Sequence, residues 1–350
     1  MRALYNKITA FFMTGTGNSY LVAKWFLAAF ADARTTLYQI SEHRPGITAG
    51  DADLLVFSYP THGFTAPWLM IKQVFRLPPG NGTHVVLLPT RAGTRLLKVS
   101  LPGMEGTAGY LIALLLWLRG YKVKGVSAVD MPANWTAVHW GLNQENVQAI
   151  IGKAGTTVQR IAARIAAGQA CYNGFIPLLI GLGLARISLM YLILAQLVLA
   201  KLFFASDQCN GCGLCRRICP RQAVSLSGHK PRWSYACDSC MACMNYCPQQ
   251  ATEVSPLTVL LFAYVLSLPV AAWLAAKLGA LFMTELSAIV NFAVQYLYTL
   301  VSVAAMCWLL HLVLRLKRVA AMLTALSHTK YFRRYRAPGA TLADIHKYNA

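Results

Sequence analysis

Acidic side chains are scarce in this sequence of 350 residues, which carries 12 Asp and Glu against 32 Lys and Arg. Charged residues of both signs make up only 13% of the chain, whereas hydrophobic residues make up 56%, which is a low charge content for a soluble protein. The sequence also shows no group of acid–base side chains of the kind that a reaction on a small substrate needs. These shortages disfavour an enzyme that acts on a substrate of its own.

The net charge of +20 does not come with the pattern of a nucleic-acid-binding protein, because no basic patch is interleaved with aromatic residues. We therefore expect no nucleic-acid partner, and the positive charge favours the surface of an anionic membrane. The first seven residues lack the apolar core of a secretory signal.

Cysteine is not spread over the chain, since eight of the ten cysteines lie between Cys209 and Cys247. They form two quartets of equal spacing, each followed by proline: Cys209, Cys212, Cys215 and Cys219, then Cys237, Cys240, Cys243 and Cys247. Bacterial two-cluster ferredoxins use this spacing, and in that motif the fourth cysteine ligates the other cluster. We therefore predict one [4Fe-4S] cluster on Cys209, Cys212, Cys215 and Cys247. The second is predicted on Cys237, Cys240, Cys243 and Cys219.

Two other uses of cysteine fit this pattern less well. A disulfide scaffold is typical of small secreted proteins, and structural zinc sites use C-x2-C pairs rather than two identical quartets. Cluster thiolates persist in a reducing compartment, so this region is expected to face the cytoplasm. Cys171 and Cys307 lie outside the pattern and are interpreted as small buried apolar residues.

An apolar strand over 8–12, a loop over 14–19 and a helix over 21–30 follow one another near the N-terminus. The loop consists of Thr14, Gly15, Thr16, Gly17, Asn18 and Ser19. Glycines let the backbone approach an anion, and hydroxyls and the free N–H groups of a helix N-terminus bind it. The Gly-Lys-Ser/Thr ending of an ATP-binding loop is missing, so ATP is not expected. An ordinary strand–helix turn remains the alternative.

Further apolar strands are predicted over 53–60, 83–88 and 121–129, with helices over 111–118 and 144–167. Strands that alternate with helices predict a doubly wound parallel sheet, whose ligand binds at the carboxyl ends of the strands. The loops that follow these strands, over 61–67, 89–93 and 131–135, should lie at that edge together with the loop 14–19.

The loop Thr14–Ser19 resembles the phosphate loop of flavodoxins, which bind FMN. A flavodoxin-like domain followed by a two-cluster ferredoxin resembles the EFR-type ferredoxin family, as do the segments Met131–Trp135, Pro231–Trp233 and Arg334–Thr341. The resemblance implies that residues 14–19 hold the FMN phosphate. Two loops would flank the flavin ring, with Trp135 nearby: Thr61, His62, Gly63 and Phe64, and Thr90, Arg91, Ala92 and Gly93. His62 and Phe64 are the candidates for ring contact, and packed loop side chains are the alternative for both.

Long apolar runs occupy much of the second half of the chain. Residues 175–204 are expected to form membrane-associated helices rather than a simple span, because Arg186 lies near the middle of the run, and a single span is the alternative. Pro256–Met283 and Leu286–Leu314 are each long enough to cross a bilayer, so together they predict a transmembrane hairpin. The basic tail that follows is expected on the cytoplasmic side.

The sequence thus predicts five regions. They are a flavodoxin-like FMN-binding domain over 1–170, a membrane-associated segment over 171–204, a two-[4Fe-4S] ferredoxin domain over 205–254, a transmembrane hairpin over 255–314 and a basic cytoplasmic tail over 315–350. The predicted fold class is α/β, a flavodoxin-like doubly wound parallel sheet, with a small α+β ferredoxin domain and transmembrane helices.

The predicted function is that of an electron-transfer protein anchored in the inner membrane of a bacterium. It would pass electrons between FMN and two [4Fe-4S] clusters, to or from a donor or acceptor protein such as a membrane redox complex, and it would contact membrane lipid. One alternative is a reductase of a quinone or another lipid-soluble substrate, with Asn291, Gln295 or His311 as possible quinone contacts. The other is a regulatory or assembly subunit of a larger membrane redox complex.

Overall fold

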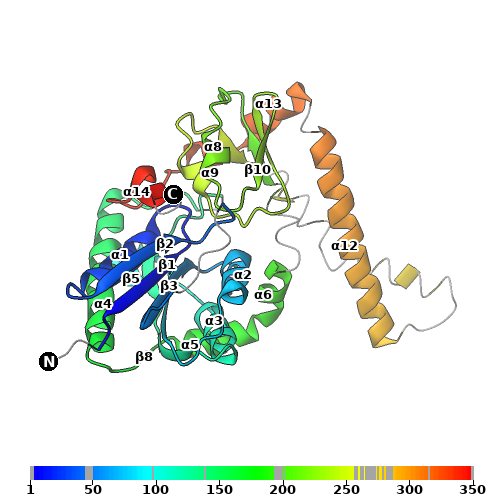
Figure 1. Cartoon of the computed structure of the whole chain (residues 1–350). Coiled ribbons are helices and arrows are strands. Elements are labelled where there is room, and N and C mark those ends of the chain that lie inside the picture. Colours follow the sequence, from blue (N-terminus) through cyan, green and yellow to red (C-terminus); the bar gives the residue numbers. More distant parts are fainter. Residues whose placement is uncertain are drawn as a thin grey trace.

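The computed structural model describes most of the chain. The described residues are 4–43, 50–96, 98–137, 139–192, 200, 202–255, 259–260, 264, 273, 276–277, 280, 287–313 and 316–347. Figure 1 shows the sheet with its helices, a smaller region beside one end of it, and a long helix that projects away from both.

A parallel sheet forms the centre of the N-terminal domain. Its main strands are β1 (Lys7–Phe12), β2 (Arg34–Gln39), β3 (Leu54–Pro60), β4 (His84–Leu96), β6 (Lys122–Val126) and β8 (Cys171–Tyr172). They lie in the order β2-β1-β3-β4-β6-β8, with every neighbouring pair parallel. The reversal of strand order at β1 and β3 is that of flavodoxin-like doubly wound sheets, which bind their ligand at this switch point.

Helices cover both faces of the sheet because its strands are apolar on both faces. Phe12 packs in one buried cluster with α1 (Asn18–Ala28) and α4 (Gln144–Ala166). The next residue along the strand, Phe11, points to the opposite face and packs in a second cluster with α2 (Trp68–Arg76) and α3 (Ala108–Leu118). The predicted doubly wound parallel sheet is therefore present.

Several predicted boundaries differ from the structure. The sequence analysis missed β2 and α2, which both carry polar residues on an exposed side. The predicted loop Thr90–Gly93 is part of β4, because these residues pair with β7 (Val129–Pro132). Past that point β4 turns back against the short antiparallel strand β5 (Val99–Leu101).

The small cysteine-rich region beside the sheet has two hairpin-like pairs of strands and two single-turn helices. Strand β9 (Phe203–Ala205) pairs with β12 (Thr252–Val254), and β10 (Val224–Ser227) pairs with β11 (Lys230–Trp233). Between them lie α8 (Leu214–Arg217) and α9 (Ala242–Asn245), and each contains the third cysteine of its quartet, Cys215 or Cys243. Phe203, Trp233 and Met244 belong to the buried cluster of this region.

The predicted transmembrane helices are wrong for the part of the chain that the structure describes. No helix there combines the length and the apolar composition that a bilayer crossing requires. The run that begins at Phe175 is divided at Leu184 into two short helices, α5 (Phe175–Gly183) and α6 (Ala185–Met190). Most of the predicted first hairpin helix, Pro256–Met283, lies outside the described residues.

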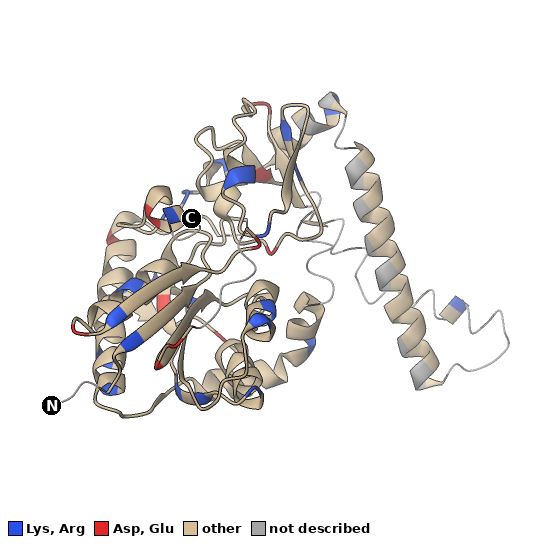
Figure 2. Ribbon diagram, in the orientation of Figure 1, with Lys and Arg blue, Asp and Glu red and all other residues tan. Residues whose placement is uncertain are grey.

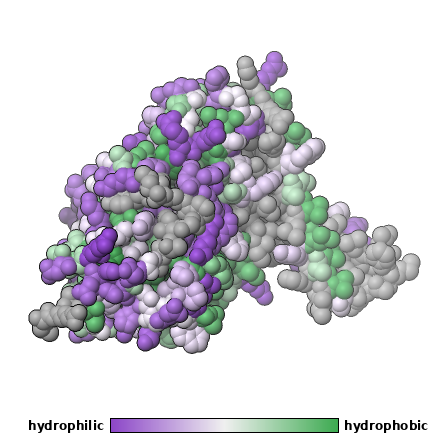
Figure 3. All heavy atoms as spheres, in the orientation of Figure 1, coloured by the Kyte–Doolittle hydropathy of each residue, from purple (hydrophilic) through white to green (hydrophobic). Residues whose placement is uncertain are grey.

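The second predicted hairpin helix corresponds to α12 (Ala288–Val313), the helix that projects from the rest of the molecule (Figure 1). Large apolar side chains are exposed on it, among them Leu297, Val301 and Trp308. Figure 3 shows green, hydrophobic residues along this helix. The side chains of Cys307 and His311 are outside the description.

The C-terminal tail is folded and returns to the N-terminal domain. It contains α13 (Lys317–Leu326), a 3-10 turn over Thr329–Tyr331 and α14 (Leu342–His346). Between the last two, Tyr335 and Ala337 are buried in the same cluster as α1 and α4. The segment that was expected to be a basic tail thus contributes to the core.

Candidate functional site

The loop between β1 and α1 has the geometry of an anion-binding turn. Gly17 has a φ of 101°, in the left-handed region that glycine adopts without strain, and its N–H donates to Thr14 Oγ1 at 2.9 Å. Helix α1 begins directly afterwards at Asn18, so its first N–H groups and the positive end of its dipole face the loop. This local order is the one that binds phosphate groups in other proteins.

Side chains of the loop are tied to the neighbouring strand ends. Asn18 Nδ2 donates to the Pro132 carbonyl at 3.0 Å, and the hydroxyls of Ser19 and Thr90 lie 3.0 Å apart. Asn134 Nδ2 donates to Thr16 Oγ1 at 2.6 Å. These bonds hold the loop and the ends of β4 and β7 in one arrangement at the carboxyl edge of the sheet.

A cavity of about 620 Å³ opens at this edge. The predicted site residues that line it are Thr14, Gly15, Asn18, Ser19, Thr61, His62, Gly63, Phe64, Thr90, Arg91, Ala92 and Trp135. Thr16, Gly17 and Gly93 were predicted with them but do not line the cavity. The volume lies within the range of about 300–1,000 Å³ that is usual for small-molecule and cofactor sites.

One polar atom in the cavity wall lacks a partner within the described part of the chain. The hydroxyl oxygen of Thr61 is buried and makes no hydrogen bond there. Leaving a buried hydroxyl unpaired costs about 1–3 kcal/mol, and Thr61 is also one of the residues that line the cavity. Thr61 was predicted on the loop that flanks a flavin ring, and its position fits that role.

Arg91 lines the cavity, but its guanidinium is already paired. It contacts Glu105 at 2.6 Å and Asp130 at 2.8 Å, and its side chain is only 15% exposed. The pair with Asp130 uses two nitrogens, Nε and Nη2, which fixes the plane of the guanidinium. Arg91 therefore holds the end of β4 against β7 rather than offering a free charge to a ligand.

His62 and Tyr191 form a hydrogen-bonded pair in the cavity wall, with His62 Nδ1 at 2.9 Å from the Tyr191 hydroxyl. Burial lowers the pKa of His62 to about 4, so the ring is neutral near pH 7. Burial also raises the pKa of Tyr191 well above its usual value, which keeps the phenol protonated. Gly63 allows this contact, because a Cβ there would lie 2.5 Å from the Tyr191 ring.

The sequence analysis did not predict the contribution of helix α6 and the residue that follows it. Ile187, Met190 and Tyr191 line the cavity, and the Ser188 hydroxyl donates to the Gly63 carbonyl at 3.1 Å. Their sequence signal was an apolar run, which predicted membrane association instead. A tyrosine within such a run was the available sign that one end of the segment meets a polar site.

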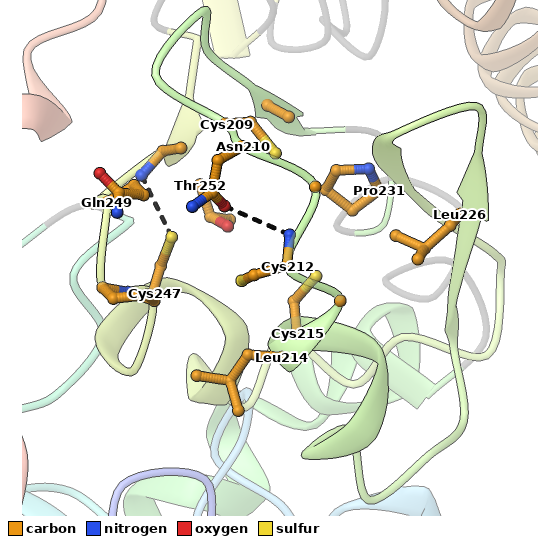
Figure 4. A pocket seen from close by; sticks show the side chains of 15 residues that line it. Cys209, Asn210, Cys212, Leu214, Cys215, Leu226, Pro231, Cys247, Gln249 and Thr252 are labelled. Atoms are coloured by element: carbon orange, nitrogen blue, oxygen red, sulfur yellow. Dashed lines mark hydrogen bonds between the residues drawn. The ribbon is translucent and has the colours of Figure 1, made fainter.

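The first predicted cluster site draws on both cysteine quartets. Cys209, Cys212, Cys215 and Cys247 line one cavity, although Cys247 lies beyond the second quartet's helix α9 (Figure 4). Figure 4 shows the Cys247 sulfur on the side of the cavity opposite Cys215, where it accepts a hydrogen bond from the Ala251 N–H at 3.3 Å. Burial raises the pKa of the Cys215 thiol to about 11, so its thiolate form requires stabilisation by a cation such as iron.

The second predicted set is more deeply placed. Cys219 and Cys237 are buried, and Cys240 and Cys243 are largely so. Hydrogen bonds reach three of these sulfurs: Ala223 N–H to Cys219 at 3.3 Å, Ser239 N–H to Cys237 at 3.4 Å and Trp233 Nε1–H to Cys243 at 3.4 Å. Such bonds to cluster sulfurs are one of the factors that set a reduction potential. Burial raises the pKa of Cys240 to about 12, as in the first set.

Among the described residues no group of three Cys, His, Asp or Glu side chains lies close enough together to hold a single metal ion. A zinc ion would draw four sulfurs to about 2.3 Å from one centre, whereas an iron–sulfur cube keeps its thiolates at separate corners.

The two candidate sites meet at the phosphate loop. The residues from Asp238 to Met241 line the 620 Å³ cavity together with Thr14 and Gly15. Trp135 spans the junction, since its Nε1 donates to the Ser239 hydroxyl at 3.4 Å. A flavin-sized ligand in the cavity would thus contact the loop that carries Cys240.

Two further groups of contacts hold the cysteine-rich region in this position. Arg221, whose side chain is 4% exposed, contacts Glu42 of the N-terminal domain at 2.7 Å and Asp238 at 3.1 Å. Asn245 is fully buried and donates to Thr136 at 3.2 Å, while its Oδ1 accepts from the Tyr335 N–H at 2.6 Å.

The C-terminal tail closes the back of the phosphate loop. The Ala337 N–H donates to the Thr16 carbonyl at 2.8 Å, and the Tyr335 hydroxyl donates to Asn18 Oδ1 at 2.7 Å. A Cβ on Gly17 would lie 2.7 Å from the Ala340 side chain. The sequence analysis marked Arg334–Thr341 for its resemblance alone, and the contacts now show that this segment supports the loop.

The chain matches one family model, that of the 4Fe-4S binding domain, over residues 203–225. The match contains Cys209, Cys212, Cys215 and Cys219 and shows an iron–sulfur binding segment there. No curated protein matches the chain. The number of clusters and the role of the second quartet stay predictions.

Some solved structures resemble part of the chain. A flavodoxin from Archaea is 12% identical, with 45% of this chain and 99% of that one covered at a TM-score of 0.28. A WrbA-like flavodoxin from Agrobacterium tumefaciens is 14% identical, with 47% and 99% covered at a TM-score of 0.32. An NADH:FMN oxidoreductase in its apo form is 15% identical, with 45% and 89% covered at 0.30. The assignment of the flavodoxin-like fold rests on the strand order given above.

Proposed function

We propose that this chain is an electron-transfer protein that binds FMN at the carboxyl edge of its parallel sheet and two [4Fe-4S] clusters in its cysteine-rich region. The phosphate of FMN would bind the N–H groups of residues 14–19, and Thr61 would bind the flavin ring. The clusters would be held by Cys209, Cys212, Cys215 and Cys247, and by Cys219, Cys237, Cys240 and Cys243.

The observation that carries this proposal is the shared cavity. Residues of the phosphate loop and of the cysteine loop 238–241 line the same cavity of about 620 Å³. FMN exchanges electrons in pairs or singly and an iron–sulfur cluster exchanges them singly, so a protein that places both together can pass electrons between two-electron and one-electron carriers. The protein's part is to hold the two groups close together and to exclude water from the path.

The residues of this chain perform that part in distinct ways. Gly15 lets the phosphate loop contact the backbone of Cys240 without an intervening side chain. Trp135 and Tyr191 supply aromatic surface on the walls, with Trp135 bonded to Ser239 and Tyr191 to His62. The tail segment 335–340 fixes the loop from behind.

Anaerobic purification followed by iron and flavin analysis tests the proposal. The expected result is about eight iron atoms and one FMN per chain, with dithionite-induced EPR signals of two interacting [4Fe-4S] clusters. About four iron atoms per chain would reduce the proposal to one cluster. Iron without flavin would overturn the flavin half, and flavin without iron would overturn the other.

A second candidate function is a reductase that acts directly on a quinone or another lipid-soluble substrate. The observation in its favour is the wall formed by Ile187, Met190 and the His62–Tyr191 pair, which combines apolar surface with a hydroxyl. A soluble quinone analogue should then oxidise the reduced protein at a rate that saturates with quinone concentration, and Tyr191→Phe should lower that rate. A rate linear in quinone concentration and equal in both proteins would exclude this candidate.

The predictions on compartment and partner stay predictions. Cluster thiolates favour a reducing compartment, which supports the cytoplasmic side of a bacterial cell as the location of the cysteine-rich region. The donor or acceptor would be another redox protein, and copurification from the native cell under anaerobic conditions would test that expectation.

A further inference from the structure

One of the two sets of predicted cluster cysteines contributes to the wall of the proposed FMN cavity, and the other lines a separate cavity. Cys240 and its neighbours Asp238, Ser239 and Met241 line the proposed FMN cavity. The cavity of the other set, with Cys209, Cys212, Cys215 and Cys247, is lined only by residues between 205 and 252, without any contribution from the N-terminal domain. We call Cys219, Cys237, Cys240 and Cys243 the near set, and Cys209, Cys212, Cys215 and Cys247 the far set.

The far set also reaches the surface. The structure describes all eight cysteines of the two quartets. Among them Cys212 is exposed, and the other seven are buried or partly buried. Its neighbours Asn210, Arg216 and Gln249 are exposed as well. A cluster at the far set would therefore be covered by little more than the Cys212 loop, which makes this the place where an electron can pass to another protein.

Basic residues surround this exposed loop. Arg216 and Arg217 occupy the last turn of α8 and are both exposed, and the Arg217 Nη1 donates to the Cys212 carbonyl at 3.2 Å. Lys230, also exposed, follows the turn that contacts Gly211. Figure 2 shows blue residues on α8 and on the neighbouring strands of this region.

Acidic residues offset little of this charge. The region 203–255 contains Asp207, Asp238 and Glu253. Asp238 and Glu253 are buried, and Asp207 is exposed and lies 3.4 Å from Lys230. The surface around Cys212, defined here as the rim of Arg216, Arg217 and Lys230, is therefore positive before the charge of a cluster is considered.

We propose that electrons travel from FMN through the near cluster to the far cluster and leave or enter the protein at Cys212, where the basic rim docks a small acidic electron-carrier protein. The inference rests on the proposed function and adds to it the order of the clusters and the class of partner. In each encounter one electron moves between the carrier and the far cluster, so that one is oxidised as the other is reduced. The rim steers the carrier by charge complementarity and so raises the association rate.

A charge reversal on the rim tests this inference. The variant is Arg216→Glu with Lys230→Glu, which leaves Arg217 and all eight cysteines in place. Its matched control is Lys153→Glu with Arg160→Glu on exposed positions of α4, which changes the net charge equally and lies on the N-terminal domain. The probe is a purified acidic bacterial ferredoxin, reduced beforehand and freed of reductant, mixed with the oxidised full-length protein in a stopped-flow instrument.

We expect the rim variant to lower the second-order rate constant at least about tenfold at low ionic strength, with the difference vanishing near 1 M salt, where the screening length is about 3 Å. The control should change the rate less than about twofold. Equal slowing in both variants, or no slowing in either, would overturn the rim as the docking surface. Faster exchange with a basic cytochrome than with the acidic ferredoxin would overturn the class of partner.

Two further measurements separate this inference from its premises. Iron and flavin content and the dithionite-induced EPR signals are recorded for each variant first, so a missing cofactor identifies a failure of the proposed function and not of the rim. Binding to anionic lipid vesicles is measured in parallel. Loss of vesicle binding in the rim variant, with an unchanged rate toward the ferredoxin, would assign the rim to a lipid surface and overturn the proposal.

Discussion

The carbonyl oxygen of Cys240 lies directly over the α-carbon of Gly15, so that a Cβ added to Gly15 would fall 1.8 Å from that oxygen. The contact joins the predicted phosphate loop to the predicted ligand loop of the near cluster. No side chain larger than hydrogen fits between the two backbones. The predicted phosphate loop and the cysteine-rich region are therefore parts of one site.

Gly15→Ala should separate the two loops, because neither backbone can move away without breaking other contacts. Overpacking of this kind costs about 1–3 kcal/mol, and we expect weaker FMN binding and slower electron exchange between flavin and clusters. Isothermal titration with FMN and flash-induced absorbance changes measure the two effects.

Gly152→Ala is the matched control, since a Cβ at Gly152 in α4 meets no atom within 4 Å. It should leave FMN affinity unchanged and raise stability by up to about 1 kcal/mol, because alanine favours the helix. Equal FMN affinity in Gly15→Ala and the control would show that the Gly15–Cys240 contact does not matter for the flavin site.

The hydrogen bond from the C-terminal tail to Asn18 predicts that removing the Tyr335 hydroxyl lowers the stability of the folded protein. Tyr335→Phe removes the donor that pairs with Asn18 at 2.7 Å and leaves the buried Asn18 oxygen unpaired. The expected loss is about 1–3 kcal/mol in stability, together with a lower affinity for FMN. Tyr331→Phe removes the same hydroxyl from a side chain that is 75% exposed, and its midpoint of thermal unfolding should match the unmodified protein. A similar midpoint for both variants would argue against a supporting role of the tail.

The fourth cysteine of each quartet is predicted to ligate the cluster of the other quartet, so a variant at that position should lose the other quartet's cluster. Cys247→Ser should impair the far cluster although Cys247 follows the second group of three, and Cys219→Ser should impair the near cluster. Each variant should hold about four iron atoms instead of about eight, with one EPR signal remaining. Cys219→Ser should slow reduction of the far cluster by FMN, and Cys247→Ser should leave flavin reduction of the near cluster intact. Cys171→Ser, a buried cysteine outside both sets, should keep all the iron.

His62 predicts a loss of stability in mild acid. Its pKa is about 4 in the folded protein and about 6.5 when unfolded, so between these values only the unfolded state binds the proton. The free energy of unfolding that the buried neutral His62 contributes is fully present above pH about 6.5. It is lost as the pH falls toward about 4, and the total loss is at most about 3 kcal/mol. His62→Gln removes this titration. The difference in unfolding midpoint between the two proteins should therefore shrink steadily from pH about 7 to pH about 4.5, and a constant difference would contradict the assignment.

The sequence predicted the sheet and the iron–sulfur segment because their signals are local. Strands such as Lys7–Phe12 are short apolar runs between turn residues, and a strand followed by a small-residue loop and a helix has one common packing solution. Cysteine spacing is equally local, since three ligands of a cluster must come from one tight loop. The regions that were missed, β2 and α2, carry polar residues that weaken the periodic signal.

The apolar runs led to the wrong prediction of transmembrane helices in the described part of the chain, because hydrophobicity reports a tendency to leave water and not the surface that accepts the side chains. The run from Phe175 was interpreted as membrane-associated, and in the structure Ile187, Met190 and Tyr191 line the cavity beside the predicted phosphate loop. The two helices that meet at Leu184 contact residues far away in the sequence, since Gly181 of α5 lies against Gly106 and the Ser188 hydroxyl of α6 donates to the Gly63 carbonyl.

What the sequence by itself determined is local: two cysteine quartets and a turn predicted to bind phosphate, each encoded within a few consecutive residues. What the tertiary structure decided is how the parts are joined. It brings Cys240 against Gly15, places the tail behind Asn18 and leaves Cys212 at the surface beside Arg216. The first two relations depend on the packing of segments hundreds of residues apart, and the pattern of any one segment carries no information about which partner it meets.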